Sequence, residues 1–395
     1  MLMNKKILAA LVSSCVVLAA CDKPAQPTAT APAQNGSAPV AAADAVVVKI
    51  GSATPMTGAN AAWGSDTDNG VRLAVDEANK EGISLDGHPV TFEVVTGDDQ
   101  ADPKMATAVA QRMVDDKVAG VIGHLTSGAA IPASTIYNQA GIPVISGSVT
   151  SPKYTQQGYN NVFRLVSDDN QQGVALADFA VKTLQFKKVA VVDDATAYGQ
   201  GLADAFEKSV IAAGGTVVKR EHTNDKANDF KAILTSIEAQ KPEVVFFGGM
   251  FSQGGTFAKQ MKTLGMSAKY MGADGSYSPE FIKLAGDAAE GAYASSTGAP
   301  KELLPEFASF QTKFKAKFNK EVDSFAPYTY DATRVMIAAM KAANSADPKK
   351  YLPELAKIQY KGVIGDVAFE PTGDIKNGTI TLYQVKSGKW ELVKK

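Results

Sequence analysis

The sequence has few of the residues from which many functional sites are built. It contains 2 Cys and 3 His in 395 residues, which excludes a disulfide-dense scaffold and a four-thiolate zinc site and disfavours a His-rich metal site. The 40 Lys and Arg balance the 41 Asp and Glu, so the chain lacks the basic surplus typical of nucleic-acid-binding proteins. It also lacks any run of about 18 apolar residues that would span a bilayer. We therefore expect no metal, no cofactor and no nucleic-acid partner.

Motifs of common enzyme classes are also missing. Gly-x-Ser-x-Gly, the Walker A loop, His-Glu-x-x-His and Cys-x-x-Cys do not occur. Gly199-Gln200-Gly201 begins a dinucleotide-like fingerprint, but Asp204 stands where the third glycine belongs. His124 follows a predicted strand, and with no nucleophile motif nearby a packing or hydrogen-bonding role is favoured over that of a general base. Asp98-Asp99 and Asp168-Asp169 are expected to be solvated loop carboxylates. No enzymatic activity is expected.

What the chain does have begins with an export signal. Lys5 and Lys6 precede the uncharged run Ile7–Ala20, which is too short to span a bilayer but suits a signal-peptide core. The run ends in Leu18-Ala19-Ala20-Cys21, which resembles a bacterial lipobox. We expect residues 1–20 to be a lipoprotein signal peptide and Cys21 to carry the lipid. An ordinary signal peptide with an incidental Cys21 is the alternative.

The next segment, residues 21–45, has the composition of a flexible tether. Pro, Ala, Gln and Thr dominate it, and bulky apolar side chains are almost absent. Such a segment cannot bury enough apolar surface to offset the loss of chain entropy on folding. A lipid on Cys21 and this tether together predict a globular body held close to a membrane.

From Val46 onward, short apolar runs alternate with amphipathic segments. This alternation predicts parallel sheets covered by helices on both faces, and the number of strands favours two α/β lobes over one. The predicted strands include Val46–Ile50, Val90–Val95, Val118–Ile122, Pro143–Ile145, Lys188–Val192, Glu243–Phe247 and Tyr270–Ala273. The predicted helices include Val71–Asn79, Pro103–Asp115, Ala129–Asn138, Leu202–Ala213 and Phe257–Leu264. Because ligands bind at the carboxyl ends of such strands, the loops after each strand are where a site is expected.

Read together, these loops resemble those of the leucine/isoleucine/valine-binding proteins of bacterial ABC importers, over Val46–Lys395. The resemblance rests on Val121-Ile122-Gly123-His124-Leu125, Pro132-Ala133-Ser134, Tyr198-Gly199-Gln200-Gly201-Leu202-Ala203, Met271-Gly272-Ala273-Asp274-Gly275 and Thr329-Tyr330-Asp331-Ala332. It implies the type I periplasmic-binding-protein fold, in which two doubly wound α/β lobes close like a clamshell. Three crossovers, near Ser167, Ser296 and Pro371, would join lobe 1 (46–167 and 297–370) to lobe 2 (168–296 and 371–395).

A free amino acid presents a carboxylate, an ammonium and a side chain to one site. Hydroxyl and backbone N–H donors suit the carboxylate, and Ser127 and Thr150 lie on loops that follow strands. In the family, the positions matching Ser127, Ser148 and Thr150 hold the carboxylate and the ammonium, Ser148 mainly through its backbone. Asp274 occupies the acidic position that pairs with the ammonium, where type members carry Glu. Taken alone, Asp274-Gly275 would read as a turn.

The apolar tail of such a ligand needs an apolar wall. Trp63, Tyr198 and Phe325 match aromatic positions beside the ligand, with Trp63 expected on the loop after the first strand. Met250 replaces a family Tyr and offers a pliable apolar surface. Other departures lie further out: Tyr328 replaces a usual Trp behind the wall, and Gln100 and Thr126 stand near the cysteine positions of a family disulfide that this chain lacks.

The resemblance implies an extracytoplasmic, periplasmic substrate-binding protein of an ABC importer. It would capture a branched-chain or aromatic L-amino acid and deliver it to permease subunits in the inner membrane, as a monomer anchored through Cys21. Two alternatives keep the fold: a sensory or regulatory lipoprotein, and a binding protein for an amide, urea or an aromatic acid. A third, an α/β hydrolase at the membrane surface, is disfavoured by the missing nucleophile motif.

Overall fold

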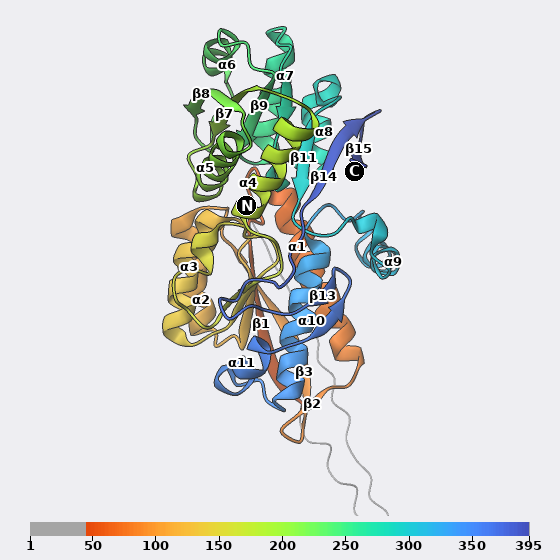
Figure 1. The fold of residues 1–395 in the computed structure, drawn as a ribbon. Coiled ribbons are helices and arrows are strands. Elements are labelled where there is room, and N and C mark those ends of the chain that lie inside the picture. Colours follow the sequence, from red (N-terminus) through yellow and green to blue (C-terminus); the bar gives the residue numbers. More distant parts are fainter. Residues whose placement is uncertain (1–44, 395) are drawn as a thin grey trace, which may run out of the picture. The chain divides into compact units, whose positions relative to one another are not determined.

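The structure, a computed structural model, describes residues 45–394. The predicted signal peptide, Cys21 and all but the last residue of the predicted tether lie outside the described residues. The described part consists of two lobes, each built on its own sheet (Figure 1). None of its helices combines the length and the apolar character required to cross a membrane.

The first lobe contains a six-stranded sheet with the strand order β2-β3-β1-β4-β5-β6. All neighbours are parallel except β2, which runs antiparallel to β3. The central strands are short apolar runs because helices cover both of their faces. The strands are β1 (Val46–Thr54), β2 (Ser84–Leu85), β3 (His88–Asp98), β4 (Gly120–Gly123), β5 (Val144–Ser146) and β6 (Val162–Arg164).

Helices cover this sheet in two groups, on opposite sides of β1 (Figure 1). One group consists of α2 (Pro103–Asp115) and α3 (Ser127–Ala140), which pack against each other. In the other group, α1 (Ala61–Lys80) packs along α10 (Ala326–Ala342), with α9 (Phe307–Phe318) and α11 (Pro348–Ala356) at its edges. α10 therefore returns to the first lobe from far along the chain.

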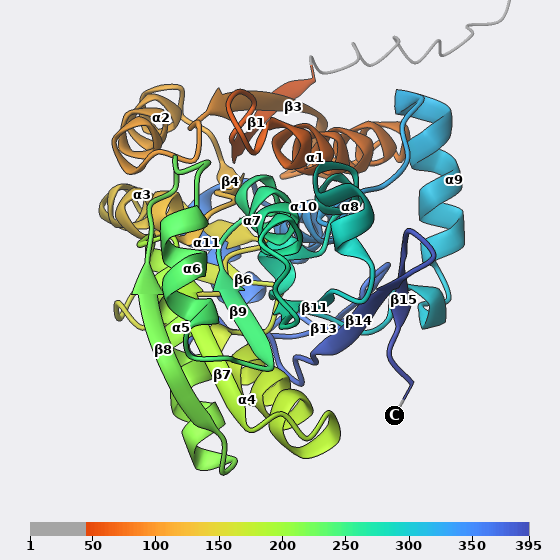
Figure 2. The same cartoon turned by 90° about the horizontal axis from the view of Figure 1, so that it is seen from above.

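The second lobe contains a seven-stranded sheet with the strand order β15-β14-β11-β10-β9-β7-β8. Five strands are parallel, and the C-terminal hairpin β14–β15 adds two antiparallel strands at one edge (Figure 2). The strands are β7 (Lys188–Asp193), β8 (Thr216–His222), β9 (Val244–Gly248), β10 (Lys269–Met271), β11 (Tyr293–Ser296), β14 (Thr381–Lys386) and β15 (Lys389–Leu392). A separate pair, β12 (Tyr360–Gly362) and β13 (Gly365–Val367), is antiparallel.

The helices of the second lobe also form packed pairs. α4 packs against α5, and α7 packs against both α6 and α8. These helices are α4 (Asp169–Asp178), α5 (Ala197–Ala212), α6 (Lys231–Glu238), α7 (Phe251–Thr263) and α8 (Pro279–Ala285). A π-helical turn, Phe179–Thr183, extends α4, and short 3-10 turns lie at Pro152–Tyr154, Asp274–Ser276, Gly286–Ala289 and Lys301–Leu303.

The chain passes between the lobes three times: after β6, after β11 and before β14. This confirms the predicted fold class of two doubly wound lobes with three crossovers. The residue boundaries of the lobes, 46–167 with 297–370 and 168–296 with 371–395, stay predictions.

Three predicted helices were wrong at their starts: α5 begins five residues earlier than predicted, α7 six residues earlier and α1 ten residues earlier. The helix predicted over Val71–Asn79 begins ten residues earlier, at Ala61, so Trp63 lies in α1 and not in a loop. Gly64 and Gly70 are weak helix formers, which is why the pattern hid this half of the helix. Both glycines are needed for packing, because a Cβ at Gly70 would overlap the carbonyl oxygen of Ala326. β6, α4, α8 and α11 were not among the predicted elements.

Candidate ligand-binding site

A small pocket lies between the two lobes, where loops that follow the strands of both sheets meet. Seven of the eight predicted site residues line it: Trp63, Ser127, Ser148 and Phe325 with lobe 1, and Tyr198, Met250 and Asp274 with lobe 2. Leu125, Thr126 and Gly275 complete the lining. The eighth, Thr150, does not line the pocket but is buried in the same loop as Ser148.

The start of α3 brings hydrogen-bond donors to one side of the pocket. Ser127 is the first residue of this helix, and the first N–H groups of a helix have no partner within it. The Ser127 hydroxyl accepts a hydrogen bond from the backbone N–H of Ser151 at 3.4 Å, which leaves its own proton to donate. These groups suit an anion, and the helix dipole favours a negative charge at this end.

Ser148 and Thr150 have different roles in the loop after β5. The Ser148 hydroxyl donates to the carbonyl oxygen of Leu125 at 2.8 Å, so it ties this loop to the loop after β4. The Thr150 hydroxyl is buried and faces the Asp169 carboxyl, whose pKa it lowers, and it has no other hydrogen-bond partner within residues 45–394. Arg164 fixes the loop, because its guanidinium donates to the carbonyl oxygens of Val149 at 3.3 Å and Ser151 at 2.9 Å. The Thr150 hydroxyl is therefore held in place.

Asp274 is bound on one of its two oxygens only. Its Oδ1 accepts hydrogen bonds from Tyr198 Oη at 2.8 Å and from Gln172 Nε2 at 2.9 Å. No hydrogen bond from the described residues reaches Oδ2. Gly275 must be a glycine here, because a Cβ would lie 2.6 Å from the Tyr198 oxygen and 2.5 Å from the carbonyl oxygen of Gly249. Burial raises the pKa of Asp274 to about 6, against the hydrogen bonds from Gln172 and Tyr198, which lower it.

A second buried carboxyl lies beside Asp274. Asp169 is 1% exposed, its Oδ1 accepts a hydrogen bond from Gln172 Nε2 at 3.3 Å, and its Oδ2 has no partner among the described residues. Its backbone N–H donates to the carbonyl oxygen of Thr150 at 2.9 Å. Burial and the charge of Asp274 raise the pKa of Asp169 well above its usual value. The expectation of a solvated Asp169 was wrong, because Asp169 is the first residue of α4 and is buried there next to the loop that carries Thr150.

Gln172 joins the two carboxyls, and no sequence pattern pointed to it. Its Nε2 donates to both Asp169 and Asp274, while its Oε1 accepts from the Ser295 hydroxyl at 2.8 Å and from the backbone N–H of Asp274 at 3.3 Å. A helix beginning at Asp169 would place Gln172 one turn along, on the same face. The capping box of Asp168 and Gln171 was the available signal for that helix.

Aromatic rings form the apolar wall. The Trp63 ring lies 5.1 Å from Phe325 and 4.6 Å from Phe251, measured between ring centroids. Phe251 begins α7 in the second lobe, directly after Met250, so this contact joins the two lobes. Phe251 was not predicted. Tyr328, expected behind the wall, lines a different hollow with Tyr277 and Tyr383.

His124 is buried beside the site without lining this pocket. Its Nδ1 lies 2.6 Å from Asp99 Oδ2 and its Nε2 lies 3.1 Å from Tyr137 Oη, which confirms the predicted hydrogen-bonding role. Asp99 is fully buried, so the expectation that it is solvated was wrong. The pair ties the loop after β3 to the loop after β4. These loops carry Gln100 and Thr126, near the positions of the missing family disulfide.

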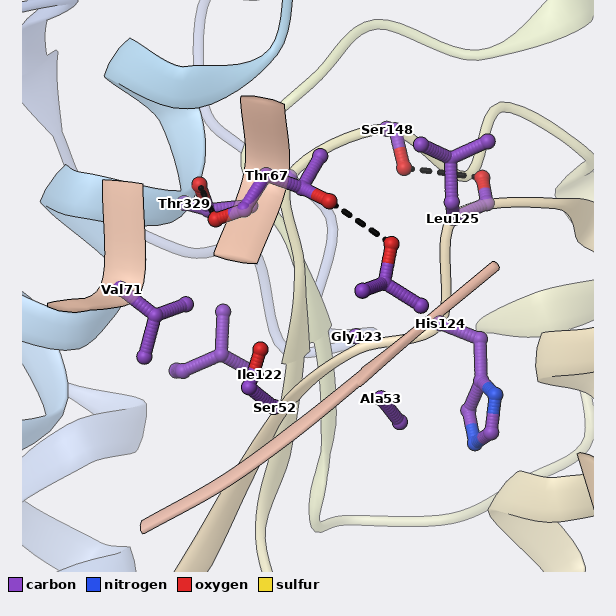
Figure 3. Close-up of a pocket in the computed structure, with 12 residues that line it drawn as sticks. Ser52, Ala53, Thr67, Val71, Ile122, Gly123, His124, Leu125, Ser148 and Thr329 are labelled. Atoms are coloured by element: carbon purple, nitrogen blue, oxygen red, sulfur yellow. Dashed lines mark hydrogen bonds between the residues drawn. The ribbon is translucent and has the colours of Figure 1, made fainter. Parts of the chain in front are cut away.

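A second cavity lies on the inner side of the loop after β4 (Figure 3). It shares Leu125 and Ser148 with the pocket. Its hydroxyls are bonded to neighbouring protein groups: Thr54 and Thr67 Oγ1 atoms lie 2.7 Å apart, Thr329 donates to the Thr67 carbonyl at 2.8 Å, and Ser52 donates to Asp68 Oδ1 at 2.8 Å. Since these groups are already paired, the cavity is a packing space and not a second polar site. Residues 45–394 contain no cluster of His, Cys, Asp or Glu suited to a metal ion.

Two α/β lobes with a polar and aromatic pocket between them define a two-lobed ligand-binding protein. The chain belongs to the periplasmic binding protein family, since the family model with that description matches residues 47–389. It is 35% identical over 365 residues to the Leu/Ile/Val-binding protein BraC3 of Rhizobium johnstonii, covering 92% of this chain and 97% of that protein.

Solved structures share the fold. The branched-chain amino acid transporter substrate-binding protein LivJ of Streptococcus pneumoniae, in complex with isoleucine, superposes with a TM-score of 0.80 at 28% identity, covering 88% of this chain and 100% of that one. A solute-binding protein of an ABC transporter from R. palustris, in complex with benzoate, gives a TM-score of 0.79 at 25% identity, covering 88% and 95%.

Proposed function

We propose that this protein captures a free apolar L-amino acid, of the leucine, isoleucine and valine type, for an ABC importer. The observation that supports this most strongly is the pair of buried carboxyls, Asp169 and Asp274, beside an aromatic wall. Buried carboxylates without a positive partner in the protein suit a cationic ligand. The start of α3 offers donors to the ligand carboxylate, and Trp63, Phe325 and Met250 surround its tail.

The ammonium of the ligand has three N–H groups and three candidate acceptors. We assign them to Asp274 Oδ2, whose carboxylate is bonded to Tyr198 and Gln172 through Oδ1, and to Asp169 Oδ2 and the Thr150 hydroxyl, which face each other beside it. The donors for the ligand carboxylate belong to lobe 1, while Asp274 belongs to lobe 2. A ligand held at both ends therefore favours the closed arrangement of the lobes.

An aromatic acid is the second candidate, since a structural neighbour binds benzoate. Benzoate has no cation, and two buried carboxyls would repel its charge. Calorimetry with leucine, isoleucine, valine, 4-methyl-2-oxopentanoate and benzoate separates the candidates. We expect leucine to bind and its keto acid, which carries a ketone in place of the ammonium, to bind at least about 100-fold more weakly. Absence of binding by all three amino acids contradicts the proposal.

The remaining parts of the proposal concern location and partners. The protein would be exported, carry a lipid on Cys21, deliver the amino acid to permease subunits of the inner membrane as a monomer, and catalyse no reaction. The lobes would move as units with the boundaries given above. Cys21→Ser is expected to move the protein from the membrane fraction to the soluble periplasmic fraction; if it stays with the membrane, the lipid assignment is wrong.

Leucine affinity is expected to fall as the pH is lowered. Burial raises the pKa of Asp274 in the free protein to about 6, and an ammonium ligand favours the ionised form. Affinity is therefore greatest above pH 6 and falls below it, by about tenfold between pH 7 and pH 5. Because the pKa of Asp169 is also raised by burial and by Asp274, binding should release protons to the buffer. Calorimetry in buffers of different ionisation enthalpy measures both effects; an affinity that is equal or higher at pH 5 contradicts the assignment.

Thr150→Val is expected to weaken leucine binding, whereas Ser148→Ala is expected to lower the stability of the protein. The Thr150 hydroxyl has no partner within the described chain other than the Asp169 carboxyl that it faces, so its removal should leave the free energy of unfolding nearly unchanged and weaken leucine binding about tenfold. Ser148→Ala leaves the Leu125 carbonyl unpaired, so it should lower the free energy of unfolding by about 1–2 kcal/mol with little loss of affinity. Urea unfolding and calorimetry on the two variants test this, and equal affinities would show that Thr150 does not contact the ligand.

A further inference from the structure

The two lobes have a second point of contact, at the turn that leads into α10. The Ser324 hydroxyl of this turn donates to the carbonyl oxygen of Tyr277 at 2.8 Å. The Ser278 hydroxyl donates to Asp323 Oδ2 at 3.1 Å. Tyr277 and Ser278 precede α8 in the second lobe, whereas α10 packs along α1 in the first. The contact therefore joins the lobes through side chains that no ligand needs to touch.

The same carboxylate also reaches the binding pocket. Trp63 Nε1 donates to Asp323 Oδ1 at 3.2 Å, and the Trp63 ring lines the pocket. Asp323 Oδ1 also accepts from the Ser324 hydroxyl at 2.9 Å, so Oδ1 is bonded within the first lobe and Oδ2 is bonded to Ser278 of the second. The Trp63 indole is 1% exposed and has this single polar atom, so the hydrogen bond to Asp323 fixes how the ring is turned.

The turn that carries Asp323 is itself firmly held. Asp66 of α1 accepts hydrogen bonds from the backbone N–H groups of four consecutive residues, 323–326, at 2.9–3.2 Å. Two hollows adjoin the turn, and both are lined by Tyr277, Asp323 and Ser324. The contact between the lobes is consequently fixed on the first lobe and borders both hollows.

We propose that Asp323 is a positioning residue that holds the Trp63 indole against the pocket and, through Ser278, fastens the two lobes in the closed arrangement. Opening the lobes separates Ser278 from Asp323 and leaves the carboxylate to water, so the orientation of the ring is coupled to closure. The effect of Asp323 on ligand release rests on the proposed function. The effect of Asp323 on the orientation of Trp63 does not depend on that function.

The chain contains 2 Trp, which makes a direct spectroscopic test practical. In full-length protein labelled with 5-fluorotryptophan, the two ¹⁹F resonances are assigned by comparison with Trp390→Phe. Without ligand, Asp323→Ala is expected to move the Trp63 resonance toward its position in the unfolded protein. Asp323→Asn keeps one acceptor oxygen and should restore most of the shift. Ser324→Ala removes the other contact between the lobes and one donor to Asp323 Oδ1, so it should move the Trp63 resonance less than Asp323→Ala does.

Stopped-flow dissociation of leucine provides the second measurement. Asp323→Ala loses three side-chain hydrogen bonds to a charged acceptor, from Trp63, Ser278 and Ser324, and the dissociation rate should rise about tenfold. Asp323→Asn and Ser324→Ala should give smaller increases, and Asp115→Ala, at an exposed site on α2, should give none. If Asp323→Ala does not fold, the Asn and Ser324 variants carry the dissociation comparison, in which both should exceed the rate of Asp115→Ala.

An unchanged Trp63 resonance in Asp323→Ala overturns the positioning role. A moved resonance with a dissociation rate within twofold of the native protein overturns the coupling to closure. If no amino acid binds the native protein, the proposed function fails, while the ¹⁹F comparison still decides whether Asp323 positions Trp63.

Discussion

Asp274→Ala is expected to weaken leucine binding by at least about 100-fold, with little change in the free energy of unfolding. The ligand ammonium would be buried without its main counter-charge, and removing one partner of a buried ion pair costs about 3 kcal/mol or more. In the free protein the effects oppose each other. Tyr198 and Gln172 lose an acceptor, but the repulsion between Asp274 and the buried Asp169 disappears. Calorimetry and urea unfolding measure the two quantities separately.

Two matched variants show whether leucine binding depends on the charge or on the size of the side chain at position 274. Asp274→Asn keeps the volume and an acceptor for Tyr198 but no charge, so it should bind leucine almost as poorly as Asp274→Ala. Asp274→Glu restores the acid that type members of the family carry and should retain measurable binding. If Asp274→Asn binds leucine as tightly as the native protein, the ammonium is not held by Asp274.

Asp66→Ala is expected to have the largest effect on stability, lowering the free energy of unfolding by about 3 kcal/mol or more. Asp66 is 5% exposed, and its carboxylate accepts four backbone N–H groups at the start of α10. Each buried donor left without an acceptor costs about 1–3 kcal/mol, reduced where water can enter. The variant should also lose leucine affinity, because Phe325 and Asp323 are positioned by this turn.

Asp76→Ala is the control on the same helix. Asp76 is about half exposed and pairs with Lys317 at the surface, so its loss should cost at most about 1 kcal/mol. The midpoints of urea unfolding should therefore differ clearly between Asp66→Ala and Asp76→Ala. Equal midpoints would show that Asp66 does not hold the start of α10.

The sequence allowed the parallel sheets to be predicted because their strands are nearly uninterrupted apolar runs, such as Val189–Val192 and Val244–Phe247. It did not reveal the first half of α1. There Asp66 and Gly70 contact residues about 260 positions away, and Gly64 lies against the Pro55 carbonyl, so none of the three follows a local periodicity. Element type is thus readable from local patterns, whereas the reasons for polar and small residues in buried helices are not.

The candidate site was predictable where the family resemblance supplied a position. Seven of the eight predicted residues share one pocket, and all of these positions came from the resemblance. Asp169 and Gln172 were missed because a carboxyl that follows a strand is usually solvated, and nothing local shows that α4 buries this one. Their roles depend on Asp274, 102 residues from Gln172 along the chain.

The single amide of Gln172 has a consequence for which nitrogen compounds the pocket can accept. It occupies Oδ1 of both carboxyls and so leaves one oxygen on each, which with the Thr150 hydroxyl makes three acceptors. A primary ammonium supplies three protons and matches them one for one. An N-methyl amino acid supplies two and would leave one buried oxygen unpaired, and a betaine supplies none. The pocket should therefore discriminate by the degree of substitution at nitrogen, rejecting N-methylleucine and excluding trimethylated analogues even where their tails fit.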